Sequence, residues 1–237
     1  MESWNLDDSV IEAYIKGFYG HGSYESKYWY IGMEAGGGGT ESEVISRIQG
    51  WHNHGRPELE PLGGSARWFR DPVPLQSTWK HLIRVTLNAE GLPAQREDIR
   101  AYQKARLGRE DGLECLLELL PLPSPGVGKW LFYPKSGLTY LRDRPTYTGY
   151  VTPSRIEHLR TRIAEHRPGV VIFYGRKYEN EWRAISGVDF KPTRIINVST
   201  ARNEHTLFVT MPHPTAHGLT NAYFGAIGQL IAAELKL

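Results

Sequence analysis

This sequence has almost no cysteine, no long apolar run and no strong excess of charge. Its single cysteine, Cys115, excludes an internal disulfide. No apolar stretch reaches the roughly 18 residues that a membrane-spanning helix needs. Lys and Arg total 28 against 26 Asp and Glu, a net charge of +2, so any nucleic-acid-binding surface has to be a local patch. Because no basic-apolar leader is found either, we expect a cytoplasmic protein that does not bind membranes.

Metal and nucleotide-phosphate motifs are also lacking. The His-Asn-His stretch at 52–54 has no matching ligands at usable spacing, and its side chains would diverge on a helix. The glycine run at 36–39 is not followed by the Gly-Lys-Ser/Thr of a P-loop. We therefore expect no metal and no cofactor.

What is present is the composition of a soluble globular protein. The 237 residues are 40% hydrophobic and 23% charged, which is enough apolar material for a substantial core. We expect one domain over residues 1–237 and a monomer.

Helix-like and strand-like segments alternate along the chain. The predicted helices lie at 9–19, from 40 onward, at 77–89, at 96–107, from 152 onward, at 176–185 and at 220–235. The predicted strands lie at 27–33, 168–175, 194–200 and 205–212, whereas 113–120 fits a strand or a short helix. This alternation predicts an α/β, three-layer αβα fold with a mainly parallel central sheet. Ligands of such folds bind outside the carboxyl ends of the strands.

One insertion, 124–150, is too rich in glycine, proline and aromatic residues to be assigned regular structure. Its aromatic residues alternate with basic ones, as in a lid that binds single-stranded nucleic acid. On this interpretation Lys129, Trp130 and Arg142 contact DNA. The alternative is that the aromatic side chains belong to the core.

A carboxylate stands at the end of the first predicted strand. Glu34 precedes the glycines of 36–39, and Thr40 with Glu43 has the form of a capping box that opens a helix. Glycine is costly to order, so this run indicates a sharp turn or a close approach to a ligand. Backbone N–H groups there can bind a base or a phosphate. Glu34 either performs chemistry or caps the helix.

A histidine follows another predicted strand. His213 lies between Pro212 and Pro214, which stiffen the loop on both sides. A carboxylate and a histidine at strand ends suit a reaction in which one activates water and the other stabilises a leaving group. The alternative for His213 is an ordinary loop histidine.

Together the two loops resemble the first and last signature motifs of the uracil-DNA glycosylase superfamily. The matching residues are Gly32-Met33-Glu34-Ala35-Gly36 and His213-Pro214-Thr215, and the order of elements is similar over about residues 25–235. In its Gly-Met start, the first loop is most similar to the single-strand-selective branch.

The resemblance implies a DNA glycosylase that extrudes a nucleotide and hydrolyses its glycosidic bond. Glu34 and His213 would then be catalytic, with Glu34 activating water and His213 stabilising charge at the base oxygen O2. The remaining implied contacts fall into two groups. Those with the base are Gly32, Met33, Ala35 and Gly36, and those with DNA are Gly37, Gly38, Thr215 and His217.

The departures from the family's pattern concern the target base. Glu34 stands where the family has Asp or Asn, and Ala35 where it has Pro. The family also has a middle motif, in which an Asn reads the base. A loose match to this motif places Glu118 at the position of that Asn. A carboxylate opposes the O4 acceptor of uracil but pairs with the N4 amino group of cytosine. With small residues from Ala35 to Gly39 leaving space beside the pocket, we expect a modified cytosine, such as the glucosylated hydroxymethylcytosine of phage DNA in antiviral defence.

Other interpretations stay open. Glu118 fits an ion pair or a surface position as well as base reading, and the enzyme fits ordinary uracil excision in DNA repair. A non-catalytic nucleic-acid-binding relative would not require Glu34. A hydrolase of small nucleosides or nucleotides would use the glycine loop for its ligand's phosphate.

Overall fold

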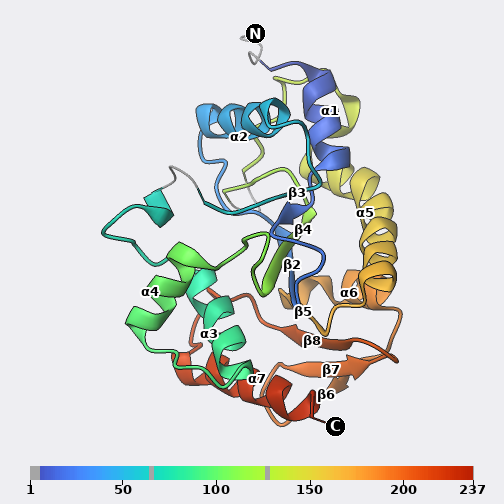
Figure 1. Ribbon diagram of the computed structural model, residues 1–237. Coiled ribbons are helices and arrows are strands. Elements are labelled where there is room, and N and C mark those ends of the chain that lie inside the picture. Colours follow the sequence, from blue (N-terminus) through green and yellow to red (C-terminus); the bar gives the residue numbers. More distant parts are fainter. Residues whose placement is uncertain (1–5, 64–66, 126–128, 237) are drawn as a thin grey trace. The chain divides into compact units, whose positions relative to one another are not determined.

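The computed structural model describes residues 6–63, 67–125 and 129–236. These residues form seven α-helices, three short 3₁₀ helices and a mixed sheet of eight strands (Figure 1). The α-helices are α1 (Asp8–Gly17), α2 (Glu41–Asn53), α3 (Trp79–Ala89), α4 (Arg96–Ala105), α5 (Arg144–His166), α6 (Glu179–Ser186) and α7 (Asn221–Glu234). The strands are β1 (Gly20–His21), β2 (Tyr28–Glu34), β3 (Leu59–Glu60), β4 (Glu114–Leu120), β5 (Val170–Tyr174), β6 (Lys191–Pro192), β7 (Ser199–Arg202) and β8 (Leu207–Met211). The 3₁₀ helices are η1 (Arg67–Phe69), η2 (Thr139–Leu141) and η3 (Arg176–Tyr178). The α/β class expected from the sequence is therefore confirmed.

The sheet has the strand order β3-β1-β4-β2-β5-β8-β7-β6. Strand β5 pairs in parallel with β2 and with β8. Strand β7 is antiparallel to both β8 and β6. The expectation of a mainly parallel sheet is thus corrected to a mixed one, because β7 returns directly beside β8 without a crossover helix.

The described chain divides into two compact units. Unit 1 is drawn from Met1–Gly20, Gly32–Glu60 and Glu118–Leu159, and unit 2 from His21–Ile31, Pro61–Leu117 and Arg160–Leu237. Strands β2 and β4 begin in unit 2 and end in unit 1, so the residues that close these two strands belong to unit 1. The expectation of a single domain stays a prediction.

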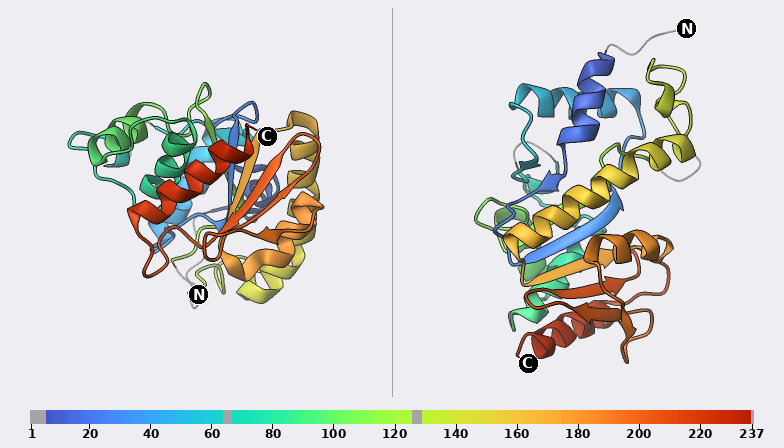
Figure 2. Two further views of the ribbon diagram at one scale, coloured as in Figure 1. Left: turned by 90° about the horizontal axis from the view of Figure 1, so that it is seen from below. Right: turned by 90° about the vertical axis from the view of Figure 1, so that its right-hand side faces the viewer.

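Unit 2 holds the larger core. Helices α3 and α7 pack against each other on one face of β5, β8 and β7, and α6 lies on the other face (Figures 1 and 2). Successive side chains of a pleated strand point to opposite faces of the sheet. Ile172 and Val209 are buried with α3 and α7, whereas Phe173 stacks on Trp182 of α6 with 5.1 Å between ring centroids.

Unit 1 is built around α1, α2 and the first part of α5. Tyr14 of α1 stacks on Phe18 and meets the ring of Trp51 from α2 edge-on, with centroids 4.9 and 5.2 Å apart. Thr40 caps α2 by accepting a hydrogen bond from the N–H of Glu43. The helix expected from the Thr40–Glu43 pattern is therefore confirmed.

Two expected boundaries are wrong. Helix α5 begins at Arg144, not near 152, because Asp143 accepts a hydrogen bond from the N–H of Thr146 and so caps the helix earlier. Pro153 therefore lies inside the helix rather than at its start. Strand β7 begins only at Ser199, since the preceding residues form a hydrogen-bonded turn. The undecided segment at 113–120 is strand β4.

Candidate active site

Glu34 is the last residue of β2 and is paired with an arginine from a distant part of unit 1. Its Oε2 accepts a hydrogen bond from Nη2 of Arg144, at 2.5 Å. The side chains are only 16% and 14% exposed, respectively, so water screens the pair weakly. Arg144 enters the site because it is the first residue of α5.

Two opposing effects set the acidity of Glu34. Burial raises the pKa of its carboxyl above the ordinary value, and the hydrogen bond and charge of Arg144 oppose that rise. Glu34 is consequently a stronger base than a surface carboxylate, while the guanidinium favours its ionised form. That combination suits a group that takes a proton from water.

The glycine loop after Glu34 is fixed at its centre. Gly37 and Gly38 have φ values of +105° and +71°, a region that side chains disfavour. A Cβ atom on Gly38 would lie 2.8 Å from the carbonyl oxygen of Pro123, so the loop also needs glycine for a close approach. The left-handed glycines therefore define the loop's shape.

Helix α2 holds the same loop from its other side. Glu43 accepts a hydrogen bond from the N–H of Gly39 at 3.2 Å, and Arg47 donates one to the carbonyl of Gly36 at 3.3 Å. Among the described residues, none accepts a hydrogen bond from the N–H groups of Gly36, Gly37 or Gly38. These three donors are therefore candidates for binding a ligand.

Glu118 of β4 brings a second carboxyl into unit 1. Its backbone is bound on both sides, with its N–H donating to Tyr19 and its carbonyl accepting from Arg155. Its side-chain Oε2 is buried, and no described residue is hydrogen-bonded to it. Such an unpaired buried oxygen is costly, which makes it a candidate for binding a ligand or an ordered water.

Burial is the main reason that Glu118 is a weak acid. Burial, together with the nearby charge of Glu34, raises its pKa to about 8, against smaller opposing contributions from Arg47 and Arg155. Glu118 is therefore largely protonated at pH 7. Unit 1 thus presents two carboxyl groups in different environments, one paired with arginine and one neutral.

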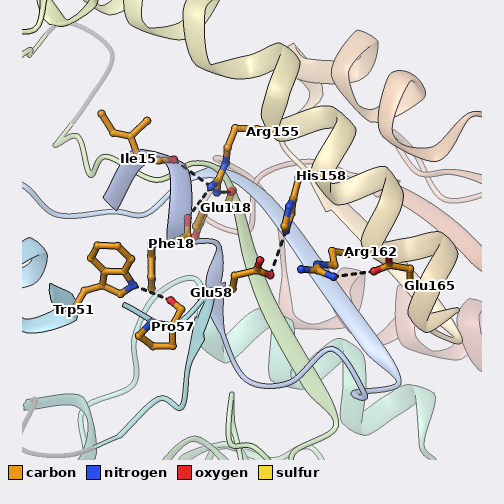
Figure 3. Close-up of polar contacts among 10 residues, drawn as sticks. All are labelled: Ile15, Phe18, Trp51, Pro57, Glu58, Glu118, Arg155, His158, Arg162 and Glu165. Atoms are coloured by element: carbon orange, nitrogen blue, oxygen red, sulfur yellow. Dashed lines mark hydrogen bonds and ion pairs between the residues drawn. The ribbon is translucent and has the colours of Figure 1, made fainter. Parts of the chain in front are cut away.

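Arg155 of α5 fixes the end of β4, a role that sequence reasoning missed. Its guanidinium donates to the carbonyl oxygen of Leu119 at 2.9 Å. It also donates to the carbonyl oxygens of Phe18 and Glu118 at 2.8 and 2.7 Å (Figure 3). It also lies over the ring of Tyr19, 3.5 Å from the centroid. Arg155 is therefore a structural cation that holds Glu118 through its backbone.

The insertion at 124–150 is more regular than expected and packs into unit 1. Residues 139–141 form η2, and those from 144 onward belong to α5. The indole of Trp130 donates to the carbonyl of Leu141 at 2.6 Å, and its ring lies against Phe132 and Tyr147. This packing favours the core alternative for Trp130, whose contact with DNA stays a prediction.

Helix starts anchor the insertion. Lys135 pairs with Glu41 in the first turn of α2, and Asp8 in the first turn of α1 accepts hydrogen bonds from Ser136 and Gly137 at 2.6 and 2.9 Å. Lys129 and Arg142, the two basic residues predicted to contact DNA, are exposed. Their side chains are therefore accessible to a ligand.

His213 lies two residues beyond β8, in unit 2. Its Nδ1 accepts a hydrogen bond from the N–H of Thr215 at 3.2 Å and lies 2.9 Å from the Thr215 hydroxyl. Because a backbone N–H can only donate, the neutral ring carries its proton on Nε2. Although the residue is exposed, partial burial of the ring lowers the pKa of His213, which favours this neutral form. His213 is thus a neutral donor.

The remaining predicted residues divide between the two units. Gly32 and Met33 are buried at the end of β2, Ala35 is half-buried and Gly36 is exposed, all in unit 1. Thr215 and His217 are exposed in unit 2, and Thr215 orients His213. The structure therefore brings Glu34, the glycine loop and Glu118 into one unit and assigns His213 to the other.

Comparisons with known proteins add nothing to this geometry. No protein-family model and no curated protein matches the chain. Over residues 6–63, 67–125 and 129–236, no group of three or more His, Cys, Asp or Glu side chains is arranged to hold a metal ion. None of the helices in the same ranges has the length and apolar character needed to cross a bilayer.

Proposed function

We propose that this protein is a DNA glycosylase that hydrolyses the bond between an extruded base and its deoxyribose. The observation that carries the proposal is the pair of unlike carboxyl groups in unit 1. Glu34 is held by Arg144, whereas Glu118 is neutral and its Oε2 has no partner among the described residues. Enzymes that use acid–base catalysis commonly contain two carboxyl groups whose environments give them different pKa values.

The proposed reaction assigns one proton transfer to each carboxyl. Glu34 takes a proton from water, the water oxygen bonds to C1′ of the sugar, and the bond from C1′ to the base breaks with its electrons leaving on the base. Glu118 gives its proton to N3 of a departing cytosine. The ionised Glu34 also favours the cationic character that develops on the sugar.

Glu118 makes cytosine the favoured target because cytosine leaves poorly unless it is protonated. A neutral carboxyl donates a hydrogen bond to N3 and accepts one from the N4 amino group. Transfer of its proton to N3 then assists the departure of the base. The small residues beside Glu34 leave space for a group on C5. We therefore propose a modified cytosine as substrate, with glucosylated hydroxymethylcytosine of phage DNA as the specific candidate.

We propose that His213 stabilises the negative charge that develops on the base oxygen O2. Its neutral ring carries the Nε2 proton as a donor because Thr215 occupies Nδ1. A neutral donor stabilises developing negative charge without giving up its proton. This assignment depends on the tautomer of His213 and on the resemblance of the His213-Pro214-Thr215 motif.

Uracil excision is a second candidate, and the state of Glu118 supports it. A protonated carboxyl can donate to O4 of uracil and accept from N3–H, so the clash expected for an ionised carboxylate disappears. Uracil departs as an anion more readily than cytosine, and its excision would depend less on the Glu118 proton.

One assay decides between these substrates. Oligonucleotides containing uracil, cytosine, hydroxymethylcytosine, glucosylated hydroxymethylcytosine or hypoxanthine are incubated with the protein, and alkali then breaks abasic sites. We expect cleavage at the glucosylated base, and a loss of at least about a hundredfold in Glu34→Gln. The exposed Glu165, at the far end of α5, provides the control Glu165→Gln, which should cleave like the parent.

Further experiments test the role of His213 and distinguish the glycosylase from the small-molecule hydrolase and the non-catalytic relative. In single-turnover experiments His213→Ala should lose about 3 to 4 kcal/mol of transition-state stabilisation while keeping its affinity for DNA. Hydrolysis of deoxycytidine or its monophosphate without action on DNA would establish the small-molecule alternative. DNA binding without any abasic product would indicate a non-catalytic relative.

A further inference from the structure

Three buried polar side chains of unit 1 have hydrogen-bonding capacity that no described residue uses. Tyr14 of α1 is fully buried, and its hydroxyl has no partner. Oε2 of Glu118 is buried without a partner in the same way. Tyr147 of α5 accepts a hydrogen bond from the N–H of Leu122 at 3.3 Å, but no described residue accepts one from its own O–H. Unpaired buried polar groups are costly, so these three need an explanation.

The last turn of α1 is tied to the backbone of Glu118. Arg155 donates to the carbonyl of Ile15, the residue after Tyr14, at 3.4 Å (Figure 3). The same guanidinium donates to the carbonyls of Phe18 and Glu118 at 2.8 and 2.7 Å. The ring of Tyr14 stacks on that of Phe18. Tyr14 and Glu118 are therefore brought into one region of unit 1.

Electrostatic effects link the three side chains and keep both phenols neutral. Burial raises the pKa of Tyr14 above its ordinary value, and the charge of Glu118 adds to that rise. Burial also raises the pKa of Tyr147, and Tyr14 contributes to that rise. Both hydroxyls therefore keep their protons at neutral pH and can act as hydrogen-bond donors.

One water molecule can satisfy all three groups. A buried water typically makes about three hydrogen bonds to polar groups that otherwise lack partners. If Tyr14 and Tyr147 donate to its two lone pairs, the water can only donate, and Oε2 of Glu118 is the acceptor. The accepting oxygen of a neutral carboxyl is its carbonyl oxygen, so the carboxyl proton is then held on Oε1.

We propose that Tyr14 and Tyr147 bind one ordered water that fixes the proton of Glu118 on Oε1 and so selects cytosine over uracil. With Oε1 facing the base, its O–H pairs with the N3 acceptor of cytosine, and the second lone pair of Oε2 accepts from the N4 amino group. Uracil presents a donor at N3 and an acceptor at O4, so the same arrangement sets donor against donor and acceptor against acceptor. Tyr14 and Tyr147 are thus positioning residues. This inference rests on the proposed function, which supplies the base that Glu118 reads.

The test uses two substrates that differ only at N3 and at the group on C4. Matched oligonucleotides carry hydroxymethylcytosine or hydroxymethyluracil, and single-turnover excision is measured on both. Tyr14→Phe keeps the ring but removes a donor, so the carboxyl proton is no longer fixed, and the ratio of cytosine to uracil excision should fall by about five- to tenfold. Tyr150, which is 58% exposed in unit 1, provides the control Tyr150→Phe, which should keep the ratio of the parent.

Two tyrosines that act through one water should give a non-additive double variant. Tyr147→Phe should lower the ratio as Tyr14→Phe does, and the double variant should lose no more than about twofold beyond either single variant. Because both substrates are measured with the same protein, the ratio does not depend on the fraction that is folded. Losses that multiply in the double variant, or an unchanged ratio in both single variants, would overturn the shared water.

A second measurement does not need excision. The infrared difference spectrum between the parent and Glu118→Gln isolates the C=O stretch of Glu118. That band should move to higher frequency in Tyr14→Phe, because the water is then free to donate elsewhere, and should stay in place in Tyr150→Phe. A crystal structure of the parent should show the water within hydrogen-bonding distance of Tyr14, Tyr147 and Glu118.

The two measurements fail separately. A protein that shows the water and the band shift but excises nothing would refute the glycosylase and leave the water site standing. A protein that excises bases but shows neither the water nor the band shift would refute the roles of Tyr14 and Tyr147 and leave the glycosylase standing.

Discussion

Arg144 and Glu34 form an ion pair between two residues 110 positions apart in the chain. The pair joins the first turn of α5 to the end of β2, and it opposes the rise in the pKa of Glu34 that burial causes. Arg144 therefore influences the protonation of Glu34 without needing a contact of its own with a ligand.

Removing Arg144 should move the acid limb of the pH–rate profile. Without the guanidinium the pKa of Glu34 rises further, so the ionised base is reached only at higher pH. In Arg144→Gln the ascending limb of single-turnover excision should shift upward by at least about one pH unit, and Arg144→Lys should shift it less. An unshifted limb with a uniformly lower rate would show that Arg144 acts only on the fold.

Glu118 should determine the alkaline limb. Its pKa of about 8 means that the proposed acid loses its proton as pH rises through 8, so excision of cytosine derivatives should fall there. Glu118→Gln should remove that limb and lower cytosine excision more than uracil excision. Equal effects on the two bases, measured on matched oligonucleotides, would contradict the assignment of Glu118 as acid.

Gly38 tests the shape of the glycine loop. Gly38→Ala places a methyl group 2.8 Å from the Pro123 carbonyl at a φ of +71°, so we expect a loss of about 1 to 3 kcal/mol in stability and a marked loss of excision. A Cβ atom on Gly39 would meet no other atom within 4 Å, so Gly39→Ala is the matched control. Thermal melting and the abasic-site assay measure both effects, and similar behaviour of the two variants would refute the argument.

Arg155 should matter for stability. Arg155→Met keeps the length of the side chain but leaves the carbonyls of Leu119, Phe18 and Glu118 without their buried donor. Hydrogen bonds from charged groups contribute about 1.5 to 3 kcal/mol each, so we expect a loss of at least about 3 kcal/mol in urea denaturation. Arg183→Met, at an exposed position of α6, should stay within about 0.5 kcal/mol of the parent.

Glu114 gives unit 2 a pH-dependent stability. This carboxyl is fully buried and accepts a hydrogen bond from the hydroxyl of Tyr102. Its pKa is raised from 4.5 to about 7, mainly by burial. The folded protein therefore binds an extra proton between those values, and its contribution to stability is complete below about pH 4.5 and is lost as pH rises through 7. The free energy of unfolding should depend less on pH in Glu114→Gln, by up to about 3 kcal/mol between about pH 4.5 and 8. The exposed Glu97 supplies the control Glu97→Gln, whose pH dependence should match that of the parent.

The sequence predicted what local patterns determine. The cap formed by Thr40 and Glu43, the strand leading to Glu34 and the strand before His213 all follow from short-range periodicity and capping. The early start of α5 was also encoded, in Asp143 followed by a proline in the first turn, but the aromatic surroundings obscured that signal.

Long-range pairing could not be predicted in the same way. Nothing near Arg144 or Arg155 in the sequence indicates which groups they bind, because their partners come from β2, β4 and the end of α1. The turn before β7 has the pattern of a strand, since Ile195, Ile196 and Val198 have high β propensity. Hydrogen bonds from Thr193 and Tyr223 override that propensity.

Arg155 binds backbone oxygens, and this has a consequence for how the protein can change over evolutionary time. Every residue type offers a carbonyl, so substitution at Phe18, Glu118 or Leu119 leaves the acceptors of Arg155 in place. The arginine itself has no such freedom. Position 118 can therefore acquire a different side chain while the strand that carries it keeps its support, and under the proposed function such a change would alter the base preference.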